Sequence, residues 1–286
     1  MSPVRWDAGH AAVNVAEATT SVHPDRLASP YRGEMLTAAA SGGSALERPH
    51  GLRRAAALWR LFRSEQTDPA PFYRLLALEA VEDLDRRYGP LRGTTIVDLG
   101  CGPGYYTDAL RDLGATVIPV DNDPVEMRLA GEPPLGALIA DAGDLPLEDA
   151  SIDGAFCSNL LEHTPSADPV LREIERILRP GGWGYISWTN WYSPWGGHDM
   201  SPYHFLGPRL GPALYVRRHG PPRKNPYGAG LWACHIGPTL RLVRARRALC
   251  IERVEPRYWP RLAVITRIPG IRELLTWNCV IRVRKV

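Results

Sequence analysis

The sequence lacks both kinds of apolar segment that carry a chain into or across a membrane. None of its 286 residues falls in a run of about 18 predominantly apolar, uncharged residues, so no membrane-spanning helix is predicted. The first residues, "MSPVRWDAGHAAVNV", also have no apolar core of the kind found in secretory signal peptides. The two absences exclude an integral helical membrane protein and favour a cytoplasmic location.

Cysteine is scarce and shows no pairing along the chain. The five cysteines are an odd number, are widely spaced and include no C-x-x-C pair: Cys101, Cys157, Cys234, Cys250 and Cys279. A disulfide framework normally uses an even number of cysteines, and structural zinc sites use close pairs. The pattern therefore favours reduced thiols, and we predict no metal centre.

Acidic residues are rare in the C-terminal third. Residues 200–286 hold 3 Asp or Glu and 17 Lys or Arg, a net charge of +14. Residues 1–199 hold 28 and 17, a net charge of −11. Two interpretations stay open: the basic part meets an anionic partner, or it packs against the acidic part and the charges neutralise each other.

Regular secondary-structure patterns begin only after the first fifty residues. Residues 1–50 are rich in Ala, Ser, Gly and Pro without a sustained period, which is typical of a flexible segment. Residues 51–93 carry two helical patterns. From 94 to 190, β-branched strands such as "TTIVDLG" alternate with amphipathic helices such as "SADPVLREIERILRPGG". This alternation predicts an α/β fold with a parallel, doubly wound sheet.

The alternation stops after Asn190. Residues 191–236 are rich in Gly, Pro and aromatic side chains and follow no period, so we interpret them as an insertion. Residues 237–286 resume with a helix, a strand, the helical pattern "RLAVITRIPGIRELLT" and a last strand. These last elements are expected to complete the sheet.

A glycine-rich loop follows the first strand of the alternating region. "VDLGCGPGYY" places an acid and three glycines there: Asp98, Gly100, Gly102 and Gly104. Glycines let the backbone approach a ligand closely, and ligands of such sheets bind at the carboxyl ends of the strands. A dinucleotide fingerprint needs G-x-G-x-x-G/A, but its third position falls on Tyr105 or Thr107. An acid before the loop would repel a pyrophosphate but suits a ligand with an ammonium group.

These motifs together resemble the class I S-adenosylmethionine-dependent methyltransferases of the broad type-11 group. "VDLGCGPGYY", "PVDNDPVEM", "ADAGDLPL", "SNLLEHTP" and "ILRPGGWGYIS" follow one another in the order of that family. The segments "FRSEQTDPAPFY", "GGHD" and "YVRRHGPPRKNPYG" also resemble an uncharacterised actinobacterial subgroup. The resemblance implies a Rossmann-like seven-stranded sheet with an antiparallel last strand, and S-adenosylmethionine as cofactor with S-adenosylhomocysteine as product.

The resemblance also implies which residues bind the cofactor. Asp98 takes the position near the methionine moiety, Asp121 holds the ribose hydroxyls, and Asp141 accepts from the adenine amino group. The remaining cofactor residues are their neighbours in these motifs: Gly100, Cys101, Gly102, Gly104, Asn122, Ala142 and Asn159. Cys101 is expected to be a small loop residue and not a nucleophile.

The acceptor side is expected to combine the segment after the fourth strand with the insertion. The candidate bases are His163 and a His198–Asp199 pair, although His163 could instead only line the cleft. The predicted substrate-binding residues are aromatic or basic: Trp191, Tyr192, Trp195, His204, Arg217 and Arg218. A metal site formed by His198, Asp199 and His204 is disfavoured because this spacing fits no compact ligand motif. The alternative interpretation is that the insertion is a structured cap that only covers the cofactor.

The predicted function is methylation of a hydroxyl on a glycan, a lipid-linked or another anionic metabolite. The alternatives are methylation of a small natural-product intermediate at carbon, oxygen or nitrogen, and binding of the cofactor without turnover. No nucleic-acid partner is predicted, because "SNLLEH" stands where an N-P-P-Y-like tetrapeptide would be expected. The basic helical pattern of residues 261–276 leaves two interpretations open: packing against the sheet, the commoner fate of such a helix, or a peripheral contact with the inner face of the membrane.

Overall fold

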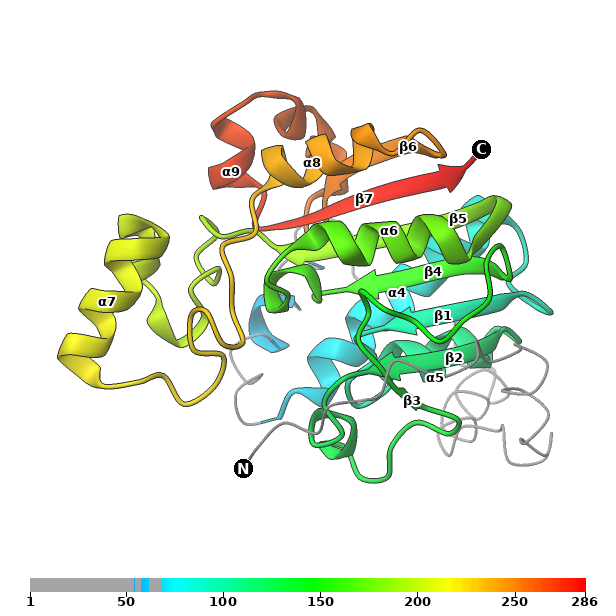
Figure 1. Ribbon diagram of the computed structural model, residues 1–286, viewed down its shortest axis with the longest axis horizontal. Coiled ribbons are helices and arrows are strands. Elements are labelled where there is room, and N and C mark those ends of the chain that lie inside the picture. Colours follow the sequence, from blue (N-terminus) through cyan, green and yellow to red (C-terminus); the bar gives the residue numbers. More distant parts are fainter. Residues whose placement is uncertain (1–53, 55–57, 62–67) are drawn as a thin grey trace.

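The computed structural model describes residues 54, 58–61 and 68–286 (Figure 1). The segment predicted to be flexible, 1–50, lies outside the described residues. A seven-stranded sheet with the order β3-β2-β1-β4-β5-β7-β6 forms the centre of the molecule. Its strands are β1 (Thr95–Leu99), β2 (Thr116–Asp121), β3 (Leu138–Ile139), β4 (Ile152–Ser158), β5 (Leu178–Thr189), β6 (Leu249–Pro256) and β7 (Asn278–Lys285).

The pairing of the strands confirms the predicted doubly wound sheet. The first five strands pair in parallel, and β7 runs antiparallel to both β5 and β6. Crossover segments join each parallel strand to the next. From β1 the chain adds β2 and β3 on one side and then β4 and β5 on the other, so the direction of strand addition reverses between β1 and β4. Such a reversal leaves a crevice at the carboxyl ends of the strands, where ligands of these folds bind.

Helices cover both faces of the sheet. The α-helices are α4 (Ala70–Tyr88), α5 (Tyr105–Asp112), α6 (Ala167–Ile177), α7 (Gly207–His219), α8 (Ile236–Ala245) and α9 (Ile271–Leu275). One buried cluster joins the sheet to α6 and α8, and another joins it to α4 and α5. In α6 the apolar side chains recur at helical spacing and are buried, and the hydroxyl of Ser166 caps the helix by accepting from Asp168 N at 3.2 Å.

Short 3₁₀ helices also occur, and one of them takes up part of a helix predicted from the sequence. Residues 124–130 contain only η2 (Glu126–Arg128). The helix expected over 261–276 is divided into η6 (Pro260–Arg267) and α9, because Pro269 cannot donate to a continuing helix and Gly270 has a φ of +80°.

The insertion contains more regular structure than its sequence indicates. It carries η4 (His198–Met200), η5 (Tyr203–Leu206) and the 13-residue α7. The apolar side chains of α7 do not gather on one face, and Pro212 lies inside the helix, which explains why its sequence shows no clear helical pattern. Figure 1 shows α7 standing out from the end of the sheet at which β4 terminates.

In the described part of the chain, no helix combines the length and the apolar character that crossing a bilayer requires.

Candidate functional site

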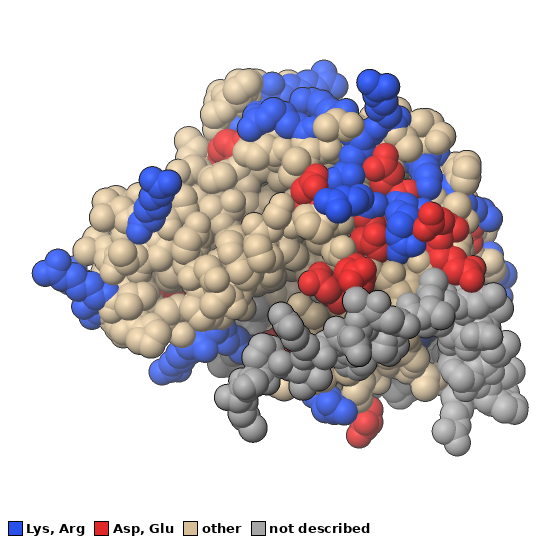
Figure 2. All heavy atoms as spheres, viewed as in Figure 1, with Lys and Arg blue, Asp and Glu red and all other residues tan. Residues whose placement is uncertain are grey.

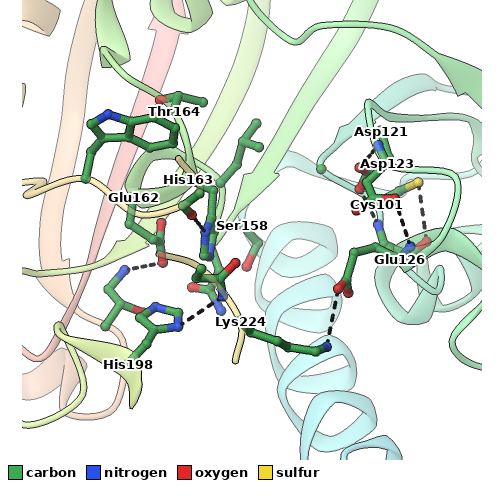
Figure 3. A pocket seen from close by; sticks show the side chains of 18 of the residues that line it. Cys101, Asp121, Asp123, Glu126, Ser158, Glu162, His163, Thr164, His198 and Lys224 are labelled. Atoms are coloured by element: carbon green, nitrogen blue, oxygen red, sulfur yellow. Dashed lines mark hydrogen bonds and ion pairs between the residues drawn. The ribbon is translucent and has the colours of Figure 1, made fainter. Parts of the chain in front are cut away.

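A cleft of about 1490 Å³ lies at the carboxyl ends of the parallel strands (Figure 3). One wall consists of the glycine-rich loop after β1 and the segments after β2 and β3. The opposite wall consists of η3 (Leu161–His163), the insertion and three aromatic residues of the C-terminal part, Tyr258, Trp259 and Trp277. The cleft is therefore built from both the regular sheet and the irregular insertion.

The glycine-rich loop is held against the end of β2 and leaves space above it. The amides of Gly100 and Cys101 donate to Val120 O at 2.8 and 3.1 Å. Gly102 lines the cleft with a φ of +47°, and a Cβ placed on it would meet no atom within 4 Å. Gly104 lies away from the lining, and a Cβ there would come within 2.6 Å of Pro134 Cγ. Gly102 thus provides an open cradle, whereas Gly104 is needed for packing.

Asp121 closes this loop with its carboxylate. Its Oδ2 accepts from Gly102 N at 2.8 Å and its Oδ1 accepts from Asp123 N at 2.9 Å. Each carboxylate oxygen has a second lone pair, so Asp121 can also accept from two hydroxyls of a ligand. Asn122 is exposed beside it and lines the cleft, as predicted from its position after the strand.

Asp98 is not on the wall of the cleft. Its side chain is 1 % exposed, and its Oδ2 accepts from Thr107 Oγ1 at 2.6 Å. Burial raises the pKa of this carboxyl to about 7, against the opposing effect of the Thr107 hydrogen bond. The predicted contact between Asp98 and a ligand is therefore corrected: this acid links β1 to α5 underneath the loop.

The motif after β3 is only partly on the wall. Asp141 is exposed and lines the cleft, and its Oδ1 accepts from Gly143 N at 2.8 Å in a tight turn. Ala142 is buried in the core, so its predicted place beside a ligand is corrected; Gly143 and Asp144 line the wall instead. Asn159, after β4, also lines the cleft, with a φ of +54° and its Oδ1 accepting from Asn278 Nδ2 at 2.8 Å.

His163 presents one free ring nitrogen to the cleft. It lies on η3 and lines the cavity, and its Nδ1 is 2.7 Å from Gly230 O in the insertion. A carbonyl oxygen can only accept, so Nδ1 carries the hydrogen in this contact. In the neutral ring Nε2 is then the acceptor, which is the state that a general base requires.

His198 and Asp199 both line the cleft but do not form the predicted hydrogen-bonded pair. The His198 ring stands edge-on to His163 with centroids 5.2 Å apart, and its Nδ1 lies 3.5 Å from Asn225 Nδ2. Asp199 Oδ2 instead accepts from Lys224 N at 3.3 Å. Burial, helped by the neighbouring His163, lowers the pKa of His198 to about 4, so this ring is neutral at neutral pH.

Glu162 is a candidate that the sequence argument missed. Its side chain lines the cleft but is 1 % exposed, and its Oε1 accepts from Thr189 N at 2.8 Å. Its Oε2 is buried and has no hydrogen-bond partner among the described residues. Burial raises the pKa of Glu162, while the adjacent His163 acts in the opposite direction. The only signal in the sequence was its position next to His163.

Arg257 is a second residue that the sequence argument missed. It is buried, and its Nη1 donates to Ser158 Oγ at 2.9 Å while its Nη2 donates to the Tyr106 hydroxyl. Ser158 and Tyr106 both line the cleft. Within residues 68–286, Arg257 forms no ion pair. A buried cation without a carboxylate therefore lies directly behind the wall.

The structure places most of the predicted substrate-binding residues elsewhere. Trp195 does line the cleft, packed edge-on against Trp277 at 4.9 Å. Trp191 and His204 are buried in the insertion, and Tyr192 packs within it. Arg217 and Arg218 are exposed on α7, and none of these five side chains lines the cleft. The ring of Trp191 packs against His204, whose Nε2 contacts Ser193 O at 2.8 Å. These five predictions are corrected, because the three rings pack within the insertion and the two arginines are exposed on α7, outside the lining of the cleft.

Known proteins similar to this chain were found among family models, sequence relatives and solved structures. Residues 97–186 match the family described as "Methyltransferase domain". A protein of Mycolicibacterium gilvum named "Uncharacterized methyltransferase" is 39% identical over 243 residues, covering 82% of this chain and 94% of its own. A relative of the same name from Mycobacterium tuberculosis H37Rv is 39% identical over 240 residues, covering 80% and 94%. A crystal structure of an S-adenosylmethionine-dependent methyltransferase from Mesorhizobium loti is 26% identical, with a TM-score of 0.49, and covers 71% of this chain and 96% of its own.

Proposed function

We propose that this chain, which belongs to the methyltransferases, uses S-adenosylmethionine to methylate a hydroxyl group of an acceptor that also carries an anionic group. The observation that carries this proposal is the ring of His163, whose Nδ1 is tied to Gly230 O and whose Nε2 is free to accept a proton in the cleft. The other parts of the site support the proposal in three steps: the cofactor, the base and the charge of the acceptor.

The residues of one wall fit the cofactor. The open cradle above Gly102 leaves room for a ligand against the backbone, and the free lone pairs of Asp121 suit the two ribose hydroxyls. Asp141, exposed on the same wall, is the candidate partner of the adenine amino group. When bound, S-adenosylmethionine supplies a methyl group on a sulfonium that is already an activated leaving group, so positioning of the acceptor provides much of the catalysis.

The opposite wall offers a base for a hydroxyl acceptor. A neutral hydroxyl is a weak nucleophile, and a neighbouring imidazole that takes its proton strengthens it. His163 can take that proton at Nε2, and the Gly230 carbonyl then stabilises the charged ring through Nδ1. The carboxyl of Glu162 next to it lies in the same dry environment, and a charged His163 lowers its pKa. The two residues can therefore hold one proton together.

The charge behind the wall favours an anionic acceptor. Arg257 is buried without a carboxylate partner among the described residues, and a buried cation of this kind is costly unless a negative charge comes close. A bound anionic group beside Ser158 and Tyr106 would supply it. The aromatic side chains of Trp195, Trp259 and Trp277 add flat apolar surface, which suits the ring of a sugar or another cyclic acceptor.

The experiment that tests the proposal is transfer of a labelled methyl group. Purified protein is incubated with methyl-labelled S-adenosylmethionine and a metabolite extract, and the labelled product is isolated and analysed. The proposal requires the label to be bound to oxygen, in a product that keeps a negative charge at neutral pH. A label on carbon or nitrogen, or an uncharged product, would contradict it.

A further inference from the structure

Two segments beside the cleft expose an unusual number of aliphatic and aromatic side chains. On η5 and α7, Phe205, Leu206, Leu210 and Leu214 are between 38% and 59% exposed. On and beside η6 and α9, six aliphatic residues are between 42% and 59% exposed: Leu262, Val264, Ile268, Ile271, Leu274 and Leu275. We refer to these ten residues as the apolar rim. Clustered exposed apolar residues normally mark a surface that meets another molecule or a lipid phase.

Both parts of the apolar rim are joined directly to the walls of the cleft. The insertion that contains α7 also supplies Asp199 and Lys224 to the lining. Trp259, which precedes η6, and Trp277, which follows α9, line the cleft as well. Figure 1 shows α7 and α9 at the same end of the molecule, beyond the ends of the strands. A surface that covered the apolar rim would therefore lie next to the entrance of the cleft.

The charged side chains exposed on α7 and η6 are all basic. No Asp or Glu occurs between Asp199 and Glu252, and α7 exposes Arg209, Arg217 and Arg218. On η6, Arg261 and Arg267 are exposed. None of these five arginines forms an ion pair with another described residue, in contrast to Arg246 and Arg282, which pair with Asp168 and Asp83 of the acidic part. Neutralisation within the chain therefore accounts for only part of the basic charge.

Glu273, the acid that α9 itself carries, is already engaged. Glu273 on α9 accepts from the amides of Ile236 and Gly237 at 3.0 and 2.8 Å. Figure 2 shows an uncharged surface at the end formed by α7, with Lys and Arg at its margins, while most Asp and Glu gather elsewhere on that face. An apolar surface bordered by arginines matches an anionic lipid bilayer, whose headgroups attract the cations while its acyl region takes up the aliphatic side chains.

We propose that the apolar rim docks this protein on an anionic membrane surface, with the entrance of the cleft toward the lipid. A second copy of the chain is a poorer occupant, because a symmetric contact would bring the same arginines against one another. Docking does not depend on the proposed methyl transfer. It would give the enzyme access to an acceptor that is anchored in the bilayer, and that consequence alone rests on the proposed function.

Sedimentation with vesicles tests the docking without any turnover. The full chain, with neither donor nor acceptor, is mixed with vesicles of phosphatidylcholine alone or with added phosphatidylglycerol, at low and at moderate salt, and centrifuged. The protein is expected in the pellet with the anionic vesicles, less so at higher salt, and in the supernatant with phosphatidylcholine alone. Wild-type protein that stays in the supernatant with anionic vesicles at low salt would overturn the proposal.

Two double variants locate the contact. Arg217→Ala with Arg218→Ala is expected to weaken partitioning roughly thirtyfold, at about fivefold for each cation near an anionic surface. The matched control removes two exposed arginines at the end of α8 and in the turn after it, Arg244→Ala with Arg247→Ala, and is expected to bind like the wild type. A control that weakens binding as much as the α7 variant would contradict the location.

A third variant tests the apolar contribution. Leu210→Glu with Leu214→Glu is expected to abolish binding to the vesicles, because two carboxylates would then enter the acyl region. Thermal unfolding and binding of S-adenosylhomocysteine report whether the variant is folded, and Ile268→Glu with Leu274→Glu provides an independent variant in the second segment. Unchanged vesicle binding by both folded variants, or a wild-type dimer that either variant converts to a monomer, would overturn the proposal.

Discussion

In the proposed function, Asp121 is the single side chain most directly suited to cofactor binding. Its two oxygens hold Gly102 N and Asp123 N, so the carboxylate is already fixed before any ligand arrives. Such preorganisation lowers the ordering cost of binding. The same carboxylate then offers its remaining lone pairs to the ligand.

We predict that Asp121→Asn weakens binding of S-adenosylhomocysteine by about 1.5–3 kcal/mol, the usual worth of a hydrogen bond to a charged group. The loss follows because an amide can accept through only one of its two terminal atoms. Isothermal titration calorimetry measures the dissociation constant. The control is Asp153→Asn, which should leave affinity unchanged. Asp153 lies near the start of β4, at the end of the strand opposite the cleft, and its Oδ2 accepts from Thr95 N. Equal affinities of wild type and Asp121→Asn would contradict the assignment.

Asp98 affects the stability of the fold through its protonation. Its pKa is raised from the ordinary 3.8 to about 7 by burial, so the folded protein keeps a proton that the unfolded chain releases between these values. Stability contributed by this group is therefore present at low pH and is lost as the pH rises from about 4 to about 7. Above that range the loss is complete.

We predict that Asp98→Asn removes this dependence. The free energy of unfolding of the variant minus that of the wild type should increase by about 2–3 kcal/mol from pH 5 to pH 8. The reason is that an amide has no charge to bury. Urea unfolding of both proteins at the two pH values measures the difference. If the difference between variant and wild type is the same at both pH values, the buried carboxyl does not titrate in this way.

At the scale of elements, the insertion is tied to the opposite wall across the cleft. Lys224 Nζ lies 3.3 Å from Glu126 Oε1 on η2 (Figure 3). The Lys224 amide donates to Asp199 Oδ2. Both partners of this ion pair are partly exposed, so it adds little to global stability. Its position suggests a different effect, namely on how fast a ligand leaves the cleft.

We predict that Lys224→Met speeds the release of S-adenosylhomocysteine severalfold and changes the free energy of unfolding by less than about 1 kcal/mol. Displacement of the bound product can be followed by the fluorescence of the tryptophans that line the cleft. Lys285→Met is the matched control, because Lys285 is the other lysine of the chain and lies at the end of β7. Identical release rates in both variants would show that the ion pair does not retain the ligand.

The elements also show how far sequence reasoning reaches. The parallel strands and α6 were predictable, because β-branched runs and a helical apolar period are local patterns. The roles inside 191–236 were not: the burial of Trp191 depends on His204 and Tyr227, which the sequence does not place around it. Arg257 escaped notice for the same reason, since its partners Ser158 and Tyr106 are 99 and 151 residues away.

At the scale of the whole molecule, the cleft divides into two walls with different tasks. The wall after β1, β2 and β3 is built from sequence motifs with a fixed order, so most of the residues that line it could be predicted. The exceptions are Asp98, Gly104 and Ala142, which lie beneath or behind the surface of the cleft. The other wall joins η3, the insertion and the C-terminal segment, and its composition depends on contacts between distant parts of the chain. Replacing His163 on this second wall should lower turnover without affecting cofactor affinity.

The most direct test of this division is the rate of labelled-methyl transfer by His163→Asn at saturating S-adenosylmethionine. The asparagine amide can still donate to Gly230 O, as His163 Nδ1 does, but it cannot accept the proton of the acceptor. We predict that turnover falls by a factor of about 10²–10⁴, the usual contribution of a general base, while the affinity for S-adenosylhomocysteine is unchanged. Turnover equal to that of the wild type would contradict the account.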